Sequence, residues 1–239
     1  DHVGFYGLIT AINFTSTIES ISMEEKDISS YEKTHRGPLS AIGTTSVSAF
    51  LQTMFQHENS VPDIQVCSFG ASQKDFLNNP DEYFAIEPLS YYDAIFITPL
   101  LLSPKSRGFI LLNESDPLWA PPLIYSGYFT NSSDSDVLVE GVELTLKLFD
   151  TESFKKYDFR LIDKSLPACR EFEFGERNYW KCVMMEYTAT PFHLVGTCKM
   201  GPSSDPQAVV NERLKVFGVD RLRVVDSSIM PKITRGNTT

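Results

Sequence analysis

The sequence is poor in basic residues and has no long apolar run, and each shortage excludes a class of protein. Its 21 Lys and Arg face 31 Asp and Glu, so the formal net charge is −10. Because an acidic chain repels phosphate backbones, nucleic acid is not an expected partner. No apolar stretch reaches the roughly 18–20 residues that a membrane helix needs, so we expect no membrane span.

Cysteine is also scarce, and its spacing is not that of a metal site. The four cysteines are Cys67, Cys169, Cys182 and Cys198. None forms a CxxC pair and no histidine lies near them at zinc spacing, so we expect no metal. A disulfide between Cys169 and Cys182 would close a loop of 14 residues, which stabilises a fold by about 3 kcal/mol. Cys198 is either a packed thiol or a partner of Cys67.

Three glycosylation sequons indicate the secretory pathway. They begin at Asn13, Asn113 and Asn131, and such sites are used on the surface of secreted proteins. Together with the possible disulfide they favour a secreted or extracellular glycoprotein. The first residues do not have the charged-then-apolar pattern of a signal peptide. They read as a strand already in progress, so we expect the chain to be a piece of a longer protein.

The remaining composition is that of an ordinary globular protein. The 239 residues are 42% hydrophobic, enough for one large domain or two small ones with a real core. Apolar runs predict strands over residues 3–15, 63–69, 94–102 and 108–112. The clearest predicted helix covers residues 134–149, with Ser133 as its N-cap and an apolar stripe on one side. A second predicted helix covers residues 179–189.

The chemistry-bearing residues gather in the last 48 positions. Residues 222–225 read as a short buried strand that ends at Asp226 and Ser227, and ligands of open α/β sheets bind at such strand ends. His193 precedes Gly196, where the backbone can approach a ligand closely. Taken singly, a lone His is more often a surface or core residue, and an Asp after a strand is commonly a turn former.

The same segment, read as a whole, resembles a known family. The stretches HLVGTCKMGP (193–202), DP (205–206), AVV (208–210), LKV (214–216) and LRVVDSSIMP (222–231) resemble the C-terminal signature of the glucose–methanol–choline (GMC) flavin oxidoreductases. Further similarities lie at residues 1–3, 36–39, 103–108, 116–117, 128 and 136–141, so the resemblance covers nearly the whole chain. The segment between Cys169 and Cys182 resembles the insect glucose dehydrogenase branch.

The resemblance implies a reaction and roles for five residues. In the family, FAD takes a hydride from the carbon of an alcohol or sugar while a base takes the hydroxyl proton. His193 stands in the position of that base. Asn237, 44 residues further on, stands where the family has His or Asn, and would orient the substrate oxygen. Asp226 and Ser227 would contact the ribityl–pyrophosphate part of FAD, and Thr238 would lie by the flavin ring.

The resemblance also implies an α+β fold with two parts. Residues 1–190 would form a substrate-binding domain with a largely antiparallel sheet backed by helices. Residues 191–239 would return to the FAD-binding α/β domain as its C-terminal strand and loops. The glycine-rich dinucleotide fingerprint of that domain is absent from these residues, as is the family's helix after Asn237. We therefore expect the 239 residues by themselves to bind flavin weakly or not at all, and to be inactive.

Substrate and acceptor stay open at this stage. An alcohol, a sugar or a sterol would fit as substrate, and a quinone or oxygen as electron acceptor. Two alternatives remain, a secreted homologue that only binds and a flavin lyase of the same fold. A homologue without catalysis has no chemical reason to keep His193, which argues against the first of them.

Overall fold

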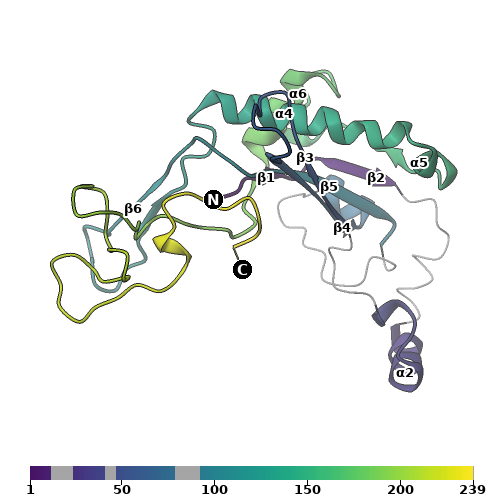
Figure 1. The fold of residues 1–239 in the computed structure, drawn as a ribbon. Helices are drawn as coiled ribbons and strands as arrows, with labels where there is room; N and C mark the ends of the chain where they lie inside the picture. The colour runs from purple at the N-terminus through teal and green to yellow at the C-terminus, as the bar shows by residue number, and fades with distance from the viewer. Residues whose placement is uncertain (12–23, 41–46, 79–91, 239) are drawn as a thin grey trace. The chain divides into compact units, whose positions relative to one another are not determined.

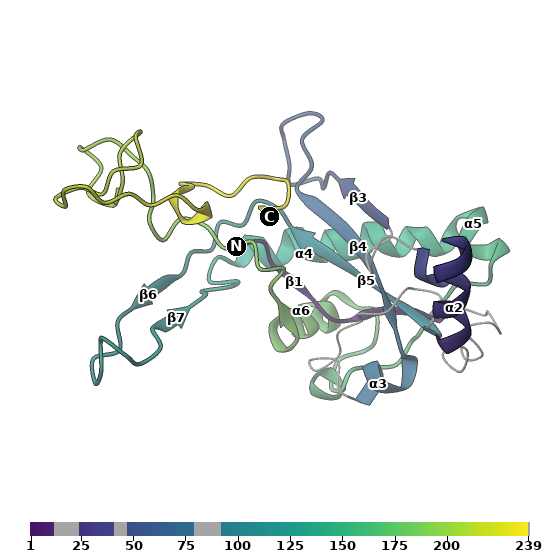
Figure 2. The same cartoon turned by 90° about the horizontal axis from the view of Figure 1, so that it is seen from below.

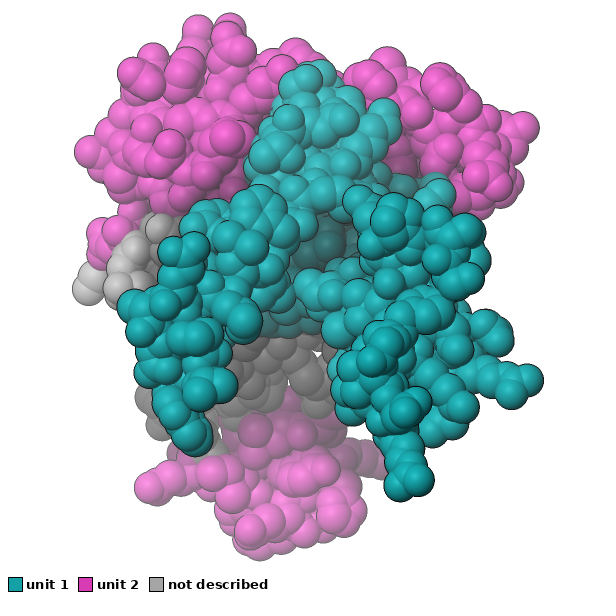
Figure 3. Space-filling view, turned by 90° about the vertical axis from the view of Figure 1, so that its left-hand side faces the viewer, with its two compact units in different colours: residues 1–3, 101–136, 190–239 teal, residues 4–100, 137–189 magenta. Residues whose placement is uncertain are grey.

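The computed structural model describes residues 1–11, 24–40, 47–78 and 92–238. They divide into two compact units, coloured in Figure 3. Unit 1 comprises residues 1–3, 101–136 and 190–239, and unit 2 comprises residues 4–100 and 137–189. The chain passes from unit 2 to unit 1 for the last time between residues 189 and 190. Unit 1 also takes in residues 1–3 and 101–136, so it is assembled from three separate stretches of chain.

A five-stranded sheet forms the centre of unit 2. Its spatial order is β3-β4-β5-β2-β8, and β3 pairs with β4, and β2 with both β5 and β8, all antiparallel. The bounds are β2 Leu8–Ala11, β3 Val47–Leu51, β4 Ile64–Ala71, β5 Ala94–Leu101 and β8 Arg160–Leu161. The strands predicted at residues 63–69 and 94–102 are confirmed, and both are largely buried.

The first predicted strand is divided in two. β1 (Gly4–Phe5) pairs antiparallel with β9 (Thr188–Ala189), whereas β2 joins the main sheet. The division falls at Gly7, where an added Cβ would lie 2.6 Å from a side-chain carbon of Val183. The missing side chain lets helix α6 approach the chain here, and the strand changes sheet at this point. The sequon at Asn13 lies outside the described residues.

Helices α4 (Ser132–Leu146), α5 (Glu152–Lys156) and α6 (Arg177–Glu186) run along one side of this sheet (Figure 1). α4 packs directly on β4, since an added Cβ on Gly141 would lie 3.0 Å from the Ile64 side chain. Both predicted helices are confirmed, although α4 gives way to a 3-10 turn, η4 (Lys147–Asp150). Ser133 is not its N-cap. The Asn131 side chain accepts from the Ser133 amide at 3.1 Å, because the helix begins two residues earlier than predicted.

The remaining helices are short. They are α2 (Glu24–Thr34), α3 (Gln73–Asn78) and the 3-10 turns η1 (Pro38–Ser40), η5 (Pro167–Cys169) and η6 (Ser227–Ile229). None of the helices in the described part of the chain is long and apolar enough to cross a membrane.

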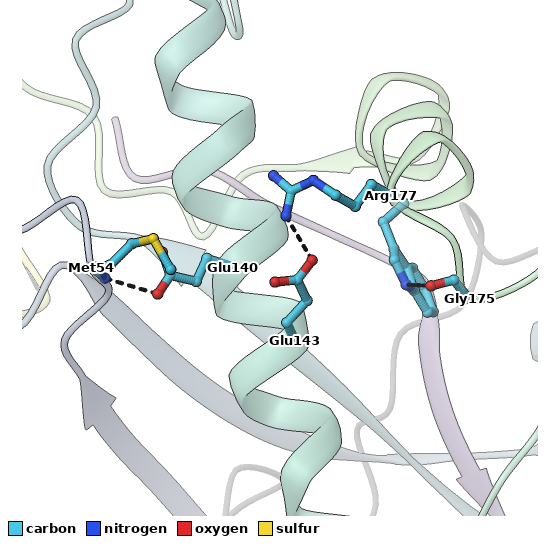
Figure 4. Close-up of polar contacts among 6 residues, drawn as sticks. Met54, Glu140, Glu143, Gly175 and Arg177 are labelled. Atoms are coloured by element: carbon cyan, nitrogen blue, oxygen red, sulfur yellow. Dashed lines mark hydrogen bonds and ion pairs between the residues drawn. The ribbon is translucent and has the colours of Figure 1, made fainter.

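Polar contacts join α4 to its neighbours on two sides (Figure 4). The buried carboxylate of Glu140 accepts from the Met54 amide at 2.8 Å, which ties the loop after β3 to the helix. One turn further on, Glu143 forms an ion pair with Arg177 of α6 at 2.6 Å. That pair is half exposed, so it stabilises by well under about 1 kcal/mol. The Glu140 contact satisfies the Met54 amide, whereas the second carboxylate oxygen of Glu140 is buried without a hydrogen-bond partner among the described residues.

The predicted disulfide is present. Cys169 in η5 is bonded to Cys182 in α6, with their Cα atoms 5.8 Å apart. Inside the closed loop, the Trp180 indole donates to the Gly175 carbonyl at 3.0 Å (Figure 4). Cys67 and Cys198 are free thiols. The alternative in which these two cysteines form a disulfide is therefore wrong.

Unit 1 combines a hairpin with an extended C-terminal segment (Figure 2). The hairpin pairs β6 (Phe109–Leu111) with β7 (Leu123–Tyr125), antiparallel and exposed. Gly127 follows it with φ +64°, and an added Cβ would lie 2.3 Å from the Arg107 carbonyl oxygen. Only glycine tolerates both the backbone conformation and the close approach, so this residue holds the base of the hairpin.

The prediction of a buried strand at residues 222–225 is wrong. Among the described residues, this segment forms one isolated β-bridge, in which Arg223 pairs with Lys215. Leu222 and Val225 are 49% and 73% exposed. An apolar run becomes a buried strand only where neighbouring strands supply hydrogen bonds and a surface to pack on. The segment does form backbone hydrogen bonds, from the Val216 amide to the Leu222 carbonyl and from the Val224 amide to the Leu214 carbonyl. Leu222 and Val225 nevertheless remain exposed, so what the segment lacks in the described part of unit 1 is a surface that buries its side chains.

Candidate active site

Two buried histidines contact each other in unit 1. His193 is 5% exposed and His2 is fully buried, and their Nδ1 atoms lie 2.9 Å apart. The two rings meet edge to face, with centroids 5.0 Å apart. The residues are separated by 191 positions in the sequence. Buried polar side chains are nearly always hydrogen-bonded, and here each imidazole is a partner of the other.

The second ring nitrogen of His2 is also occupied. Nε2 lies 2.8 Å from the carbonyl oxygen of Thr234, which holds the C-terminal segment beside the first residues of the chain. The described part of the C-terminal segment accordingly passes close to the N-terminus in Figures 1 and 2. Asn237 follows three residues after Thr234, a stretch that spans at most about 11 Å.

Asp1 ties together the backbone on which both histidines stand. Its carboxylate accepts from the Tyr128 hydroxyl at 2.5 Å and from the Thr190 hydroxyl at 2.6 Å. The Thr190 oxygen in turn accepts from the amide of Phe192 at 3.0 Å. Segments from three distant parts of the chain therefore converge on one carboxylate, which places both imidazoles.

The backbone around His193 is turned by residues in the left-handed region. Phe192 has φ +62° and Gly196 has φ +89°. A left-handed conformation is costly for a bulky side chain such as Phe, and the bond from its amide to Thr190 helps to hold it. The turn points His193 inward, whereas the flanking Phe192 and Leu194 are 73% and 60% exposed.

Burial keeps both histidines uncharged at neutral pH. It lowers the pKa of His193 below the ordinary value of 6.5, because a charged ring loses its hydration. The pKa of His2 is lowered to about 4, chiefly by burial and further by the neighbouring His193, although the bond to the Thr234 carbonyl acts in the opposite direction. A neutral His193 retains one ring nitrogen with a lone pair, as a general base must.

Asp226 and Ser227 lie in the same part of unit 1 as His193. Asp226 caps η6 by accepting from the Ser228 amide at 2.8 Å and from the Ser228 hydroxyl. The Ser228 hydroxyl, and then its amide, lower the pKa of Asp226. The Ser227 hydroxyl donates to the carbonyl of Leu194 at 3.0 Å, next to His193. The structure thus brings these three predicted residues together.

Asn237 and Thr238 are less closely tied to the pair. Asn237 is exposed and Thr238 half-buried, and among the described residues no hydrogen bond joins Asn237 to His193. The link runs through Thr234 and His2 instead. Within the same described ranges, no cluster of three or more His, Cys, Asp or Glu side chains could hold a metal ion.

Sequence reasoning assigned no role to His2, Thr190 or Thr234. His2 and Tyr128 lie in segments that resemble the GMC family, but nothing in their local sequence pairs them with the C-terminal segment. The one signal available was that a His and an Asp adjoin at the start of the chain, which is too common to be informative alone.

Comparison with known proteins gives a consistent result. The family model described as GMC oxidoreductase matches residues 104–239. Glucose dehydrogenase [FAD, quinone] of Drosophila pseudoobscura pseudoobscura is 38% identical over 210 residues, 84% of this chain and 32% of the relative. Ecdysone oxidase of Bombyx mori is 38% identical over 147 residues, 62% of this chain and 21% of the relative. The chain thus spans about a third or less of the length of these relatives.

Solved structures share the fold. A variant of the formate oxidase from Aspergillus oryzae matches with a TM-score of 0.74 at 21% identity, covering 99% of this chain and 43% of that one. Pyridoxine 4-oxidase matches with a TM-score of 0.67 at 20% identity, covering 99% and 39%. The α+β architecture predicted from the sequence is confirmed by this likeness.

Proposed function

This chain belongs to the GMC oxidoreductase family, and on that premise we propose that it takes part in the FAD-dependent oxidation of an alcohol or sugar CH–OH group, with His193 as the general base. The observation that carries the proposal is the buried, uncharged His193, held by a second histidine. FAD as the cofactor is supported by the name of the relative that shares 38% identity over 84% of the chain.

In the proposed reaction the alcohol loses a proton from oxygen and a hydride from carbon, and becomes a carbonyl compound. Bound FAD would supply the hydride acceptor. His193 removes the hydroxyl proton, and its lowered pKa keeps it ready to accept that proton at neutral pH. Asn237 cannot titrate, so its role is to hydrogen-bond the substrate oxygen and stabilise charge on it.

The residues near His193 fit one portion of a flavin. Gly196 presents open backbone, since the nearest atom to an added Cβ is the Met230 carbonyl oxygen at 3.4 Å. The exposed Phe192 and Leu194 offer an apolar flank of the kind that a cofactor ring packs against. Asp226 and Ser227 would hold the ribityl–pyrophosphate part, and Thr238 would lie by the ring. In this assignment residues 1–190 contribute substrate binding and residues 191–239 complete the FAD-binding domain.

We propose further that the protein is secreted and glycosylated. The disulfide between Cys169 and Cys182 supports an oxidising compartment. Of the sequon residues described, Asn131 is exposed and Asn113 is half-buried. A quinone or oxygen would serve as electron acceptor, and the substrate would be a small alcohol, a sugar or a sterol.

The proposal is tested by mixing the full-length, flavin-loaded protein anaerobically with alcohols, sugars and sterols while the flavin absorbance is followed. We expect one class to bleach the flavin and to yield the matching carbonyl product. Bleaching by none of them, in protein shown to contain intact flavin, would contradict oxidation of CH–OH groups and favour a flavin lyase or a binding protein.

Acid should slow the reaction through His193. The neutral ring is the active form, and its pKa lies below 6.5, so we expect a constant rate of flavin reduction around neutral pH. The rate should fall as the pH drops through that lowered pKa. Measuring the rate from about pH 4 to pH 8 checks this, with His193→Gln as the control that lacks the acid limb. An inflection clearly above pH 6.5 would contradict the assigned base.

A further inference from the structure

We propose that His2 is a positioning residue that sets the tautomer of His193, so that Nε2 of His193 is the atom that takes the substrate proton. This inference rests on the proposed function, in which His193 is the base. It follows from a chain of three groups in unit 1, the Thr234 carbonyl, the His2 ring and the His193 ring, joined by contacts of 2.8 Å and 2.9 Å.

The direction of the chain is set at its Thr234 end. A carbonyl oxygen can only accept a hydrogen bond, so Nε2 of His2 must carry the proton that lies between them. With the opposite tautomer, two lone pairs would face each other at 2.8 Å, one of them on the fully buried His2 ring. This repulsion disfavours the opposite tautomer. The Leu102 carbonyl also acts on the His2 ring, but more weakly than the Thr234 carbonyl, so the Thr234 contact selects the arrangement.

The number of protons on His2 then determines which residue donates in the contact between His2 and His193. A neutral imidazole carries one N–H, and His2 has used it on Thr234, so its Nδ1 presents a lone pair. The pKa of about 4 means that a second proton on His2 is disfavoured at neutral pH. Nδ1 of His193, 2.9 Å away, must therefore donate to Nδ1 of His2.

The basic atom of His193 follows directly. Its single proton is on Nδ1, so the lone pair is on Nε2, on the side of the ring away from His2. In a Ser-His-Asp triad, a carboxylate selects the tautomer and orientation of the histidine in the same way. His2 is neutral, and it selects the tautomer without adding a negative charge that would raise the pKa of His193.

The arrangement is held from outside by Asp1. The carboxylate of Asp1, the residue before His2, accepts hydrogen bonds from the hydroxyls of Tyr128 and Thr190. Asp1 thus helps to place the backbone of the two imidazoles, and the contact with the His2 ring selects the tautomer of His193.

The test reads the tautomer directly, by solid-state 15N NMR of the flavin-loaded full-length protein labelled only at histidine. The signals of His2 and His193 are identified as those that single substitution of each of these two residues removes from the spectrum. We expect protonated Nδ1 and unprotonated Nε2 at His193, and the reverse in His2→Phe, which removes the acceptor. His2→Asn places an amide oxygen near the former Nδ1 and should keep the original tautomer.

Kinetics of the same variants supply the second readout. His2→Phe should lower the rate constant of flavin reduction by about 100-fold or more with little change in KM, as expected when a base is misoriented. His2→Asn should recover most of the rate, and His57→Phe, at an exposed residue, should match the wild type in both tautomer and rate.

Two failures are distinguishable. An unprotonated Nδ1 at His193 in the wild type, or a tautomer unchanged in His2→Phe, would overturn the role of His2 even if His193 is the base. The wild-type spectrum alone can overturn that role, even if His2→Phe does not fold. An unchanged reduction rate in His193→Gln would instead reject His193 as the base of the proposed function, whatever its tautomer.

Discussion

Substitution of His193 by Gln is expected to slow flavin reduction by the alcohol substrate about 10²–10⁴-fold, the range that general-base catalysis contributes. Gln has a similar length and can hydrogen-bond the same neighbours, but it cannot take a proton near neutral pH. His193 is buried and bonded to His2, so Gln leaves the site filled. The loss should fall on the rate constant of reduction and spare KM.

Anaerobic stopped-flow measurement of flavin reduction checks this expectation. The flavin content of the variant, read from its absorbance, separates loss of chemistry from loss of cofactor. His35→Gln, at an exposed histidine, is the matched control and should behave as the wild type. A reduction rate in His193→Gln within a few-fold of the wild type would assign the base to another residue.

Removal of the disulfide is expected to lower the free energy of unfolding by about 3 kcal/mol. The double variant Cys169→Ser, Cys182→Ser opens a loop whose ends are 13 positions apart, and the loss arises mainly from the larger entropy of the unfolded chain. Cys169 is buried, so its replacement by Ser adds a smaller cost of burying a hydroxyl. Urea unfolding of the oxidised protein and the variant measures the difference.

A reducing agent separates the bond from the side chains. Reduction should destabilise the wild type by a similar amount and leave the double variant unaffected. Equal stability of the oxidised wild type and the variant would mean that packing of η5 against α6 already restrains this loop.

Much of the fold of unit 2 is predictable from local pattern. β4 and β5 are apolar runs bounded by breakers, and α4 shows an apolar stripe with the buried Leu138 and Val142. In such segments, the spacing of the apolar residues and the single face that they bury determine whether a helix or a strand forms. The prediction fails where contact with a neighbouring helix or sheet decides the secondary structure. Gly7 divides a strand because of Val183 in α6, and residues 222–225 do not form a strand because they lack a neighbouring sheet among the described residues.

The candidate site was predictable only in part. His193, Asp226 and Ser227 are identified by the resemblance of one continuous segment, and the structure brings them together through Ser227 and Leu194. The site residues themselves, with Asn237 and Thr238, remain predictions. His2 could not be found in the same way, because its significance depends on a contact across 191 positions.

The sequence by itself therefore determined the family, the types of the longest elements of unit 2 and the identity of the candidate base. These follow from short-range pattern and from the order of motifs along one segment. Only the tertiary structure decided which residues surround His193. Those residues in turn determine which ring nitrogen of His193 carries the proton. A tautomer depends on donors and acceptors within about 3 Å, and here His2 and Thr234 arrive from opposite ends of the chain.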